Sequence, residues 1–450
     1  MDKPRGFGVE ALPLGSLDIE IPFCPHGPTL LFERYYASKE PRKFFVCSVH
    51  RNRKGCPFFH WADEPISEEK SQRWMSTFRE SQPKINRLKL QSSLVAAQSL
   101  PPTQRYYCYQ CSILFFESDL MSHSGHFLTK EISDEVLLKP TKLITPVDDR
   151  KSQAQFYFSK PFLQLFVREL TRLDYTHVLC VGTPRLHETL SCSETFHSLL
   201  LDIDHRYAQF FSVEKFQRFN MFTSHFYEKG GRKVCEEFLT SSPGKVAIVV
   251  DPPFGGLATV LAAGLQGLWK MAGGDLTTFL VFPYFMESHV TDTLPSLWMM
   301  DYQVTYDNHK HFSDTAKNPS PVRIFTNLPQ PGLKLPATKG YRLCVPCNKY
   351  VAKQNTHCNT CDSCTSKNGR QYSHCFSCGE CVKPGRVHCA TCNKCELPDH
   401  QCGQKASVGC HVCGSLEHKR RDCPKTKCTP KPSKRKLPGP KQARAKRHKK

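Results

Sequence analysis

The chain has 450 residues, and its 62 Lys and Arg against 41 Asp and Glu give a net charge of +21, which favours a polyanionic partner. Twelve of these basic residues lie between positions 424 and 450, so the remainder carries only +9. We find no signal peptide and no apolar run of about 18 residues, and therefore expect an intracellular chain in which the 24 cysteines do not form a disulfide framework.

Cysteine and histidine spacing predicts metal sites along the chain. Twenty of the cysteines lie in Cys/His clusters of metal-ligand type. Sets of four nitrogen and sulfur ligands indicate zinc, and the ligands would suffice for up to about seven ions. The candidate ligands are Cys24, His26, Cys47, Cys56, Cys108, Cys111, His123, His126, Cys344, Cys347, His357, Cys358, Cys361, Cys364, His374, Cys375, Cys378, Cys381, His388, Cys389, Cys392, Cys395, His400, Cys402, Cys410, Cys413, His418 and Cys423.

The first two modules precede any α/β pattern. Residues 1–66 resemble a GRF zinc finger through Cys24-x-His26 and the aromatic residues around Cys47 and Cys56. That resemblance implies binding of single-stranded nucleic acid by aromatic and basic groups, although the basic residues could equally form a solvated face. A helix and a linker are expected over 67–103. Residues 104–128 resemble a C2H2 finger, and both base reading and bracing of the next domain remain open.

Residues 150–330 predict an alternating α/β domain of Rossmann-like type. Helices are expected over 161–173 and 257–271, and a linker over 329–339. The predicted strands cover 178–181, 198–202, 246–251, 279–282, 302–306 and 323–326.

Three repeats of His-Cys-x2-Cys-x2-Cys dominate residues 340–403, whose folding energy must come from metal binding. The segment resembles Cys/His-rich fingers of the DHHC or CTCHY type. A palmitoyltransferase is excluded because no Asp-His-His-Cys and no membrane span occur, whereas a ubiquitin ligase remains an alternative. Residues 408–424 match a CCHC zinc knuckle, a module that mostly binds single-stranded RNA, and 425–450 form a basic tail expected to be disordered.

The chemistry is expected where the apolar strand 245–250 ends. Asp251 follows it at once, and Pro252 and Pro253 stop the strand. An acid at the carboxyl end of a central strand lies where open α/β sheets bind ligands. The Asp251 side chain and the Pro252 carbonyl can accept hydrogen bonds from an exocyclic adenine amine, while Phe254 stacks on the base. The alternative is a simple strand-terminating turn.

This region resembles class I S-adenosylmethionine-dependent methyltransferases, and Asp251-Pro252-Pro253-Phe254 matches the motif of their amino-methylating members. The resemblance implies S-adenosylmethionine as cofactor, with Asp202 binding its ribose. The loop after residue 181 departs from the family's Gly-x-Gly pattern and keeps only Gly182. The implied cofactor-binding residues are Gln155, Phe156, Tyr157, Phe158, Gly182, Arg185, Asp202, Asn220, Met221 and Phe222.

The order of modules resembles a family of zinc-finger RNA methyltransferases. The resemblance implies N6-methyladenosine formation in large-subunit (28S) ribosomal RNA, a location in nucleus and nucleolus with the cytoplasm left open, and RNA-processing or ribosome-assembly proteins as further candidate partners. Two other readings remain: a non-catalytic RNA-binding adaptor whose loop at Gly182 no longer holds a cofactor, and a ubiquitin ligase built on residues 344–402. DNA is not excluded as a substrate.

Overall fold

The computed structural model describes residues 8–13, 19–36, 40–50, 52–147, 154–253, 257–316 and 319–402. The chain divides into two compact units, Met1–Tyr372 and Ser373–Lys450. Phe254, the knuckle ligands Cys410, Cys413, His418 and Cys423, and the basic tail lie outside the described residues. Within the described ranges, no helix combines the length and the apolar character needed to cross a membrane.

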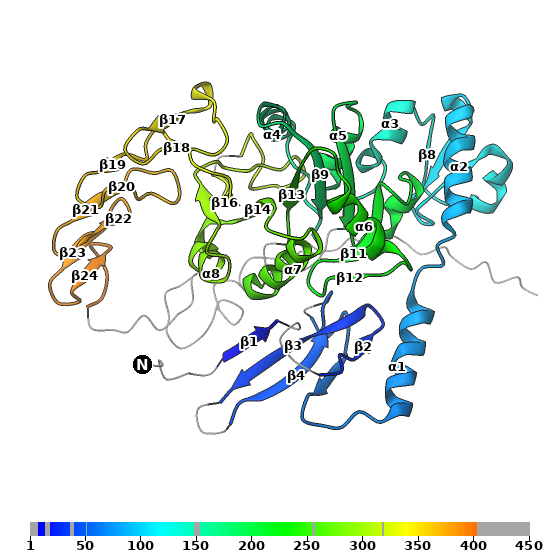
Figure 1. Cartoon of the computed structure of the whole chain (residues 1–450), viewed down its shortest axis with the longest axis horizontal. Helices are drawn as coiled ribbons and strands as arrows, with labels where there is room; N and C mark the ends of the chain where they lie inside the picture. The colour runs from blue at the N-terminus through cyan, green and yellow to red at the C-terminus, as the bar shows by residue number, and fades with distance from the viewer. Residues whose placement is uncertain are drawn as a thin grey trace, which may run out of the picture. The chain divides into compact units, whose positions relative to one another are not determined.

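An eight-stranded mixed sheet forms the centre of the first unit (Figure 1). Its order is β12-β11-β10-β9-β13-β14-β16-β15, in which β9 to β11, β13 and β14 run parallel and β16 is antiparallel to its neighbours. The chain reverses direction across the sheet between β9 and β13, which creates a crevice at their carboxyl ends. The strands are β9 (Tyr175–Val181), β10 (His197–Asp202), β11 (Phe216–Asn220), β12 (His225–Phe226), β13 (Lys245–Val250), β14 (Thr277–Pro283), β15 (Trp298–Met300) and β16 (Val322–Thr326).

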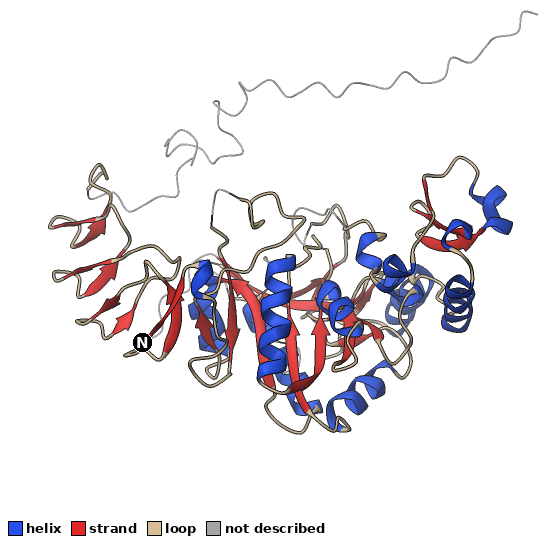
Figure 2. Cartoon of the chain, turned by 90° about the horizontal axis from the view of Figure 1, so that it is seen from above, coloured by secondary structure: helices blue, strands red, loops and turns tan. Residues whose placement is uncertain are grey.

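Helices cover both faces of this sheet (Figure 2). Both faces of the sheet are apolar, because successive side chains of β9 point to opposite sides. Val178 and Cys180 pack into one buried cluster, and Leu179 and Val181 pack into another. The first cluster includes α4 (Lys160–Arg172) and α5 (Pro184–Ser191), and the second includes α6 (Gly231–Thr240), α7 (Ala258–Met271) and α8 (Glu287–Thr293). These three layers confirm the predicted α/β fold class.

One expected strand was wrong, and one strand of the sheet was not expected. Residues 302–306 are not a strand: apart from an isolated bridge between Phe158 and Tyr306, their backbone bonds go to separate partners, such as Val322 and Ser159. The edge strand β15 lies just before them instead. The sequence pattern also missed β11, because Phe216–Asn220 mixes two aromatic with three polar residues and contains no apolar run.

The expected linkers are also more ordered than predicted. Between α1 (Glu68–Ser81) and residue 101 the chain forms a second helix, α2 (Arg87–Ser99), whose first turn is capped by Asn86 accepting from the amide of Lys89. Leu333 and Leu335, in the second predicted linker, are buried in the core of the first unit.

Small sheets carry the zinc-ligand pattern. The first comprises β1 (Gly8–Leu12), β2 (Phe23–Cys24), β3 (Gly27–Tyr35), β4 (Arg42–Cys47) and β5 (Phe59–Trp61). The second comprises β6 (Arg105–Cys108), β7 (Ile113–Phe116) and β8 (Leu128–Lys130), followed by α3 (Asp134–Leu138). Two-stranded hairpins follow from residue 341: β17 (Tyr341–Cys344), β18 (Lys349–Ala352), β19 (His357–Cys358), β20 (Ser363–Cys364), β21 (Ser373–Cys375), β22 (Glu380–Val382), β23 (Val387–Cys389) and β24 (Lys394–Glu396).

Candidate active site and metal centres

A cavity of about 370 Å³ opens at the carboxyl ends of the central strands. Gly182 follows β9, Asp202 ends β10, Asn220 ends β11 and Asp251 follows β13, and all four line it. The fold therefore brings together residues that are up to 69 positions apart. This is the crevice in which open α/β sheets bind ligands.

Gly182 occupies a position that only glycine fits well. Its φ is +66°, and a Cβ placed there would lie 2.9 Å from the Met221 Cε and 3.1 Å from the Asp251 carbonyl oxygen. Its amide donates to the Leu201 carbonyl at 2.9 Å, and the amide of Asp251 donates to the Val181 carbonyl at 3.1 Å. The single glycine of the atypical loop thus lies where the backbone after β9 packs closely against the backbone at Asp251.

Asp202 and Asp204, at the end of β10, have different hydrogen-bond partners. Asp204 is engaged by Arg206 and by the Gln155 amide, 2.9 Å away, and the arginine helps to keep the pKa of this buried acid below its usual range. The Asp202 Oδ1 accepts from the backbone amide of Asp204 at 2.9 Å, and no side chain of the described residues donates to this carboxyl. Burial, with the nearby charge of Asp204, raises the pKa of Asp202 to about 7. Asp202 is therefore the acid with an oxygen left for a ligand.

Asp251 meets a partner that lies 55 positions further along the chain. The Tyr306 hydroxyl donates to Asp251 Oδ1 at 2.9 Å, and the Tyr306 ring is fully buried. Although part of Asp251 is exposed to the cavity, surrounding protein raises the pKa of its carboxyl well above the usual range, and the bond from Tyr306 offsets part of this increase. Pro252 and Pro253 line the cavity beside it.

The segment before α4 contributes to the cavity only in part. Gln155, Phe156 and Tyr157 line it. Phe158 is packed in the core, and Arg185 is outside the lining, where it pairs with Asp307 and donates to the Phe158 carbonyl at 3.3 Å. Arg185 therefore holds the entry segment in place and does not border the cavity.

The loop after β11 forms the wall beside Gly182. Asn220, Met221 and Phe222 all line the cavity. The Asn220 Oδ1 accepts from the Phe222 amide at 3.0 Å, which fixes the direction of this loop.

We expect cofactor affinity to depend on the protonation of Asp202. A carboxylate can accept two ribose hydroxyls, whereas its neutral form accepts less strongly. With a pKa of about 7, affinity should fall as pH falls, by about tenfold between pH 8 and pH 6. Titration calorimetry with S-adenosylhomocysteine at pH 6, 7 and 8 measures this. Asp202→Asn should bind weakly at all three values, and an equally steep dependence in that variant would assign the titration to another group.

Replacing Tyr306 by Phe should move the acidic limb of the pH–rate profile. The lost hydroxyl donates to the charged form of Asp251, so its removal raises the pKa of this carboxyl further. We expect kcat/KM to fall about 2–10-fold at neutral pH and the acidic limb to shift to higher pH. Tyr302→Phe is the control, because this ring packs against Phe162. Equal profiles for the two variants would contradict the role of Tyr306.

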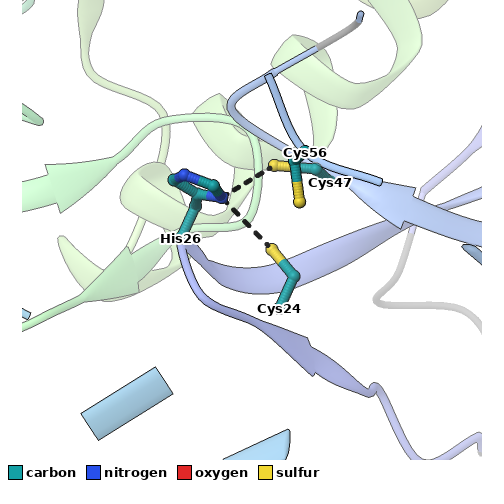
Figure 3. A group of neighbouring side chains, drawn as sticks. All are labelled: Cys24, His26, Cys47 and Cys56. Carbon is teal, nitrogen blue, oxygen red and sulfur yellow. Dashed lines mark hydrogen bonds between the residues drawn. The ribbon is translucent and has the colours of Figure 1, made fainter. Parts of the chain in front are cut away.

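The first zinc-ligand cluster is assembled from β2, β4 and the turns beside them (Figure 3). One donor atom from each of Cys24, His26, Cys47 and Cys56 lies within 4.8 Å of the others. The Cys24 and Cys47 sulfurs lie 4.0 and 3.6 Å from the His26 Nδ1. Tetrahedral zinc with bonds near 2.3 Å places its ligands roughly 3.8 Å apart, so this cluster fits the ion.

The second cluster fits zinc for a further reason. Its Cys108 and Cys111 sulfurs lie 3.3 and 3.4 Å from the His126 Nδ1. The fourth member, His123, is buried, and its Nδ1 has no hydrogen-bond partner among the described residues. A metal would satisfy this nitrogen, which otherwise carries a desolvation cost.

Within each unit, neighbouring hairpins of residues 344–402 share the ligands of one cluster. In the first unit, Cys344 and Cys347 join His357 and Cys364, the outer residues of the first repeat. In the second unit, a corresponding cluster contains Cys375, Cys378, His388 and Cys395. Cys389 and Cys392 lie 3.3 Å from the Cys402 sulfur and 3.4 Å from the His400 Nε2, respectively. Cys358 and Cys361 belong to the first unit, while His374 and Cys381, 3.9 Å apart, belong to the second.

Sequence reasoning missed several residues of the cavity. Arg218 and Tyr227 line it, and so do Pro25, Ser48 and Gln82 from the N-terminal region. None of them carries a motif, and only the fold places them near Asp251. Tyr306 was included in a wrongly predicted strand over 302–306 and was not assigned to the site.

The strand order, the cavity and Asp251-Pro252-Pro253 define a class I S-adenosylmethionine-dependent methyltransferase of the amino-methylating type. Residues 149–327 match the model of a family described as probable N6-adenine methyltransferase, and residues 22–65 match the GRF zinc finger. The chain is 44% identical to the Homo sapiens rRNA N(6)-adenosine-methyltransferase ZCCHC4 over 427 residues, which cover 90% of this chain and 83% of the human protein. The ZCCHC4 proteins of Mus musculus (44%, covering 93% of this chain and 86% of theirs) and Xenopus tropicalis (41%, 93% and 89%) are similar as well. The chain belongs to the ZCCHC4 family of rRNA N(6)-adenosine-methyltransferases.

Proposed function

We propose that this protein forms N6-methyladenosine in large-subunit (28S) ribosomal RNA, with S-adenosylmethionine as methyl donor. The observation that carries the proposal is the position of Asp251-Pro252-Pro253, which faces the same cavity as Gly182 and Asp202. The ribosomal substrate is suggested by the names of the relatives.

The geometry supports catalysis by positioning. The lone pair of the adenine amine is delocalised into the ring, so the amine is a poor nucleophile. Asp251, held by Tyr306, and the Pro252 carbonyl would accept its two hydrogens and direct the lone pair toward the cofactor. Bound S-adenosylmethionine supplies an electrophilic methyl group. The base must leave its stack to enter the cavity, which costs least in a loop or single strand.

The GRF-type finger carries a stacking surface suited to RNA. The rings of Phe44 and Phe59 stack with centroids 5.2 Å apart, and Trp61 stands edge-on to both. Arg42 lies over the Trp61 ring at 4.1 Å and Arg53 over the Phe59 ring at 4.9 Å. Aromatic rings bordered by guanidinium groups bind unpaired bases with little sequence preference.

The C2H2-type finger is built into the first unit, which supports a bracing role. Gln209 of the methyltransferase domain accepts from the Leu114 amide at 2.9 Å and donates to the Ser112 carbonyl at 2.7 Å. Tyr107 of this finger is buried in the main core.

The charge of the chain and its proposed substrate support proposals for its cellular location and its protein partners. The basic tail favours delivery to the nucleus and nucleolus, and a ribosomal RNA substrate would bring the protein together with ribosome-assembly or RNA-processing proteins. Up to about seven zinc ions would complete the Cys/His clusters and the knuckle.

The decisive test is mass spectrometry of nucleosides from purified large-subunit ribosomal RNA in cells lacking the protein. We expect N6-methyladenosine to decrease and to return with the wild-type chain but not with Asp251→Ala. Unchanged N6-methyladenosine would refute the proposed substrate. Calorimetry distinguishes the enzyme from the non-catalytic adaptor, because the adaptor would bind no S-adenosylmethionine even at millimolar concentration.

A further inference from the structure

The GRF-type finger, defined as residues 22–65, forms part of the wall of the cofactor cavity. Pro25, His26, Ser48 and Val49 line the same cavity as Asp202 and Asp251. His26 and Cys47, the neighbour of Ser48, are zinc ligands of the cluster in Figure 3. The finger and the catalytic domain therefore share one binding site, although more than 150 residues separate Ser48 from the β10 and β13 ends.

A buried hydrogen-bond relay joins the finger to the cavity. The Ser48 hydroxyl donates to the Pro28 carbonyl at 2.8 Å and accepts from the Asn220 Nδ2 at 2.9 Å. The Asn220 Oδ1 in turn accepts from the Phe222 amide at 3.0 Å. Both Ser48 and Asn220 are buried, at 5% and 1% exposure, so no water would replace a lost bond readily. The relay fixes the loop that also carries Met221.

A second set of contacts holds the same two parts together. The Tyr227 hydroxyl donates to the carbonyl oxygen of His26 at 2.7 Å. Arg218 lies over the Tyr227 ring at 3.9 Å and donates to the Gln82 Oε1, at the end of α1, at 2.8 Å. Gly27 has a φ of +119°, and a Cβ there would lie 3.1 Å from the Tyr227 hydroxyl oxygen. The backbone at His26 and Gly27 thus packs against Tyr227, which lines the cavity.

We propose that the GRF-type finger is a structural component of the cofactor site and that Ser48 is a positioning residue for cofactor binding, acting through Asn220. This inference rests on the proposed function, since it names a further part of the same site. Zinc orders the loops that carry His26 and Ser48, and Ser48 orders the loop 220–222. Because linkage is reciprocal, cofactor binding stabilises the zinc-bound finger.

Calorimetry of the full-length protein with S-adenosylhomocysteine tests the relay. Ser48→Ala and Asn220→Ala should each weaken binding about tenfold, and the double variant should be no weaker than Asn220→Ala alone. Ser71→Ala is the matched control, because this half-buried serine donates to Glu20 and does not line the cavity. Wild-type affinity in Ser48→Ala, or additive losses in the double variant, would overturn the proposal. Failure of the wild type to bind would instead refute the proposed function.

A second measurement uses the unaltered chain and is independent of variant folding. Thiol alkylation in the presence of a zinc chelator is followed by peptide mass spectrometry. Saturating S-adenosylhomocysteine should slow alkylation of Cys24 and Cys56 at least about threefold, while Cys108 and Cys111 of the C2H2-type finger react at an unchanged rate. Equal rates with and without S-adenosylhomocysteine at Cys24 and Cys56 would contradict the linkage.

Discussion

Asp251→Ala is expected to lower kcat for methyl transfer by at least about 10³-fold while leaving affinity for S-adenosylhomocysteine nearly unchanged. The carboxylate accepts from the Tyr306 hydroxyl and faces the cavity, where it would accept from the substrate amine. Its removal therefore takes away an interaction with the reacting group. Single-turnover assays on a ribosomal RNA fragment, together with calorimetry, separate the two quantities.

Asp251→Asn is the matched control for this prediction. The amide oxygen can still accept one hydrogen bond from the substrate amine. We expect this variant to keep measurable transfer and to lose the acidic limb of the pH–rate profile. If Asp251→Ala loses cofactor binding and transfer to the same extent, the acid serves the cofactor rather than the amine.

Gly182→Ala is expected to weaken cofactor binding by about 100-fold or more. The added methyl group would meet the Met221 Cε at 2.9 Å and the Asp251 carbonyl at 3.1 Å, and the φ of +66° strains any residue with a side chain. The carbonyl belongs to the backbone of the active site and cannot move without displacing Pro252. Calorimetry with S-adenosylhomocysteine measures the loss.

Gly273→Ala separates backbone strain from crowding. This glycine follows α7 with a similar φ of +82°, but a Cβ there would contact nothing within 4 Å. Both variants should lower the free energy of unfolding by about 1 kcal/mol through strain, and only Gly182→Ala should lose cofactor affinity. Equal binding by the two variants would show that the loop at Gly182 does not border the cofactor.

The sequence by itself determined the class of fold and the chemistry of the site. An apolar strand ending in Asp251-Pro252-Pro253 predicted an acid at a strand end, because β-strand hydrophobicity and proline restrictions are local properties. Zinc-ligand spacing was equally local. The sequence pattern failed where tertiary contacts determine the local structure. β11 contains polar residues because its neighbours and the finger form hydrogen bonds with them. Residues 302–306 have the pattern of a strand, but their backbone groups form hydrogen bonds with several separate segments.

Only the tertiary structure decided which distant residues complete the site. Tyr306 reaches Asp251 because the segment after β15 crosses back to Phe158, and Ser48 reaches Asn220 because the GRF-type finger packs beside β11 and β12. Neither contact has a sequence signature, since a single hydrogen bond between residues far apart leaves no periodicity or spacing. The pairing of zinc ligands also lacks a sequence signature, because many combinations of Cys and His satisfy the spacing. Only the path of the folded chain determines which ligands come together.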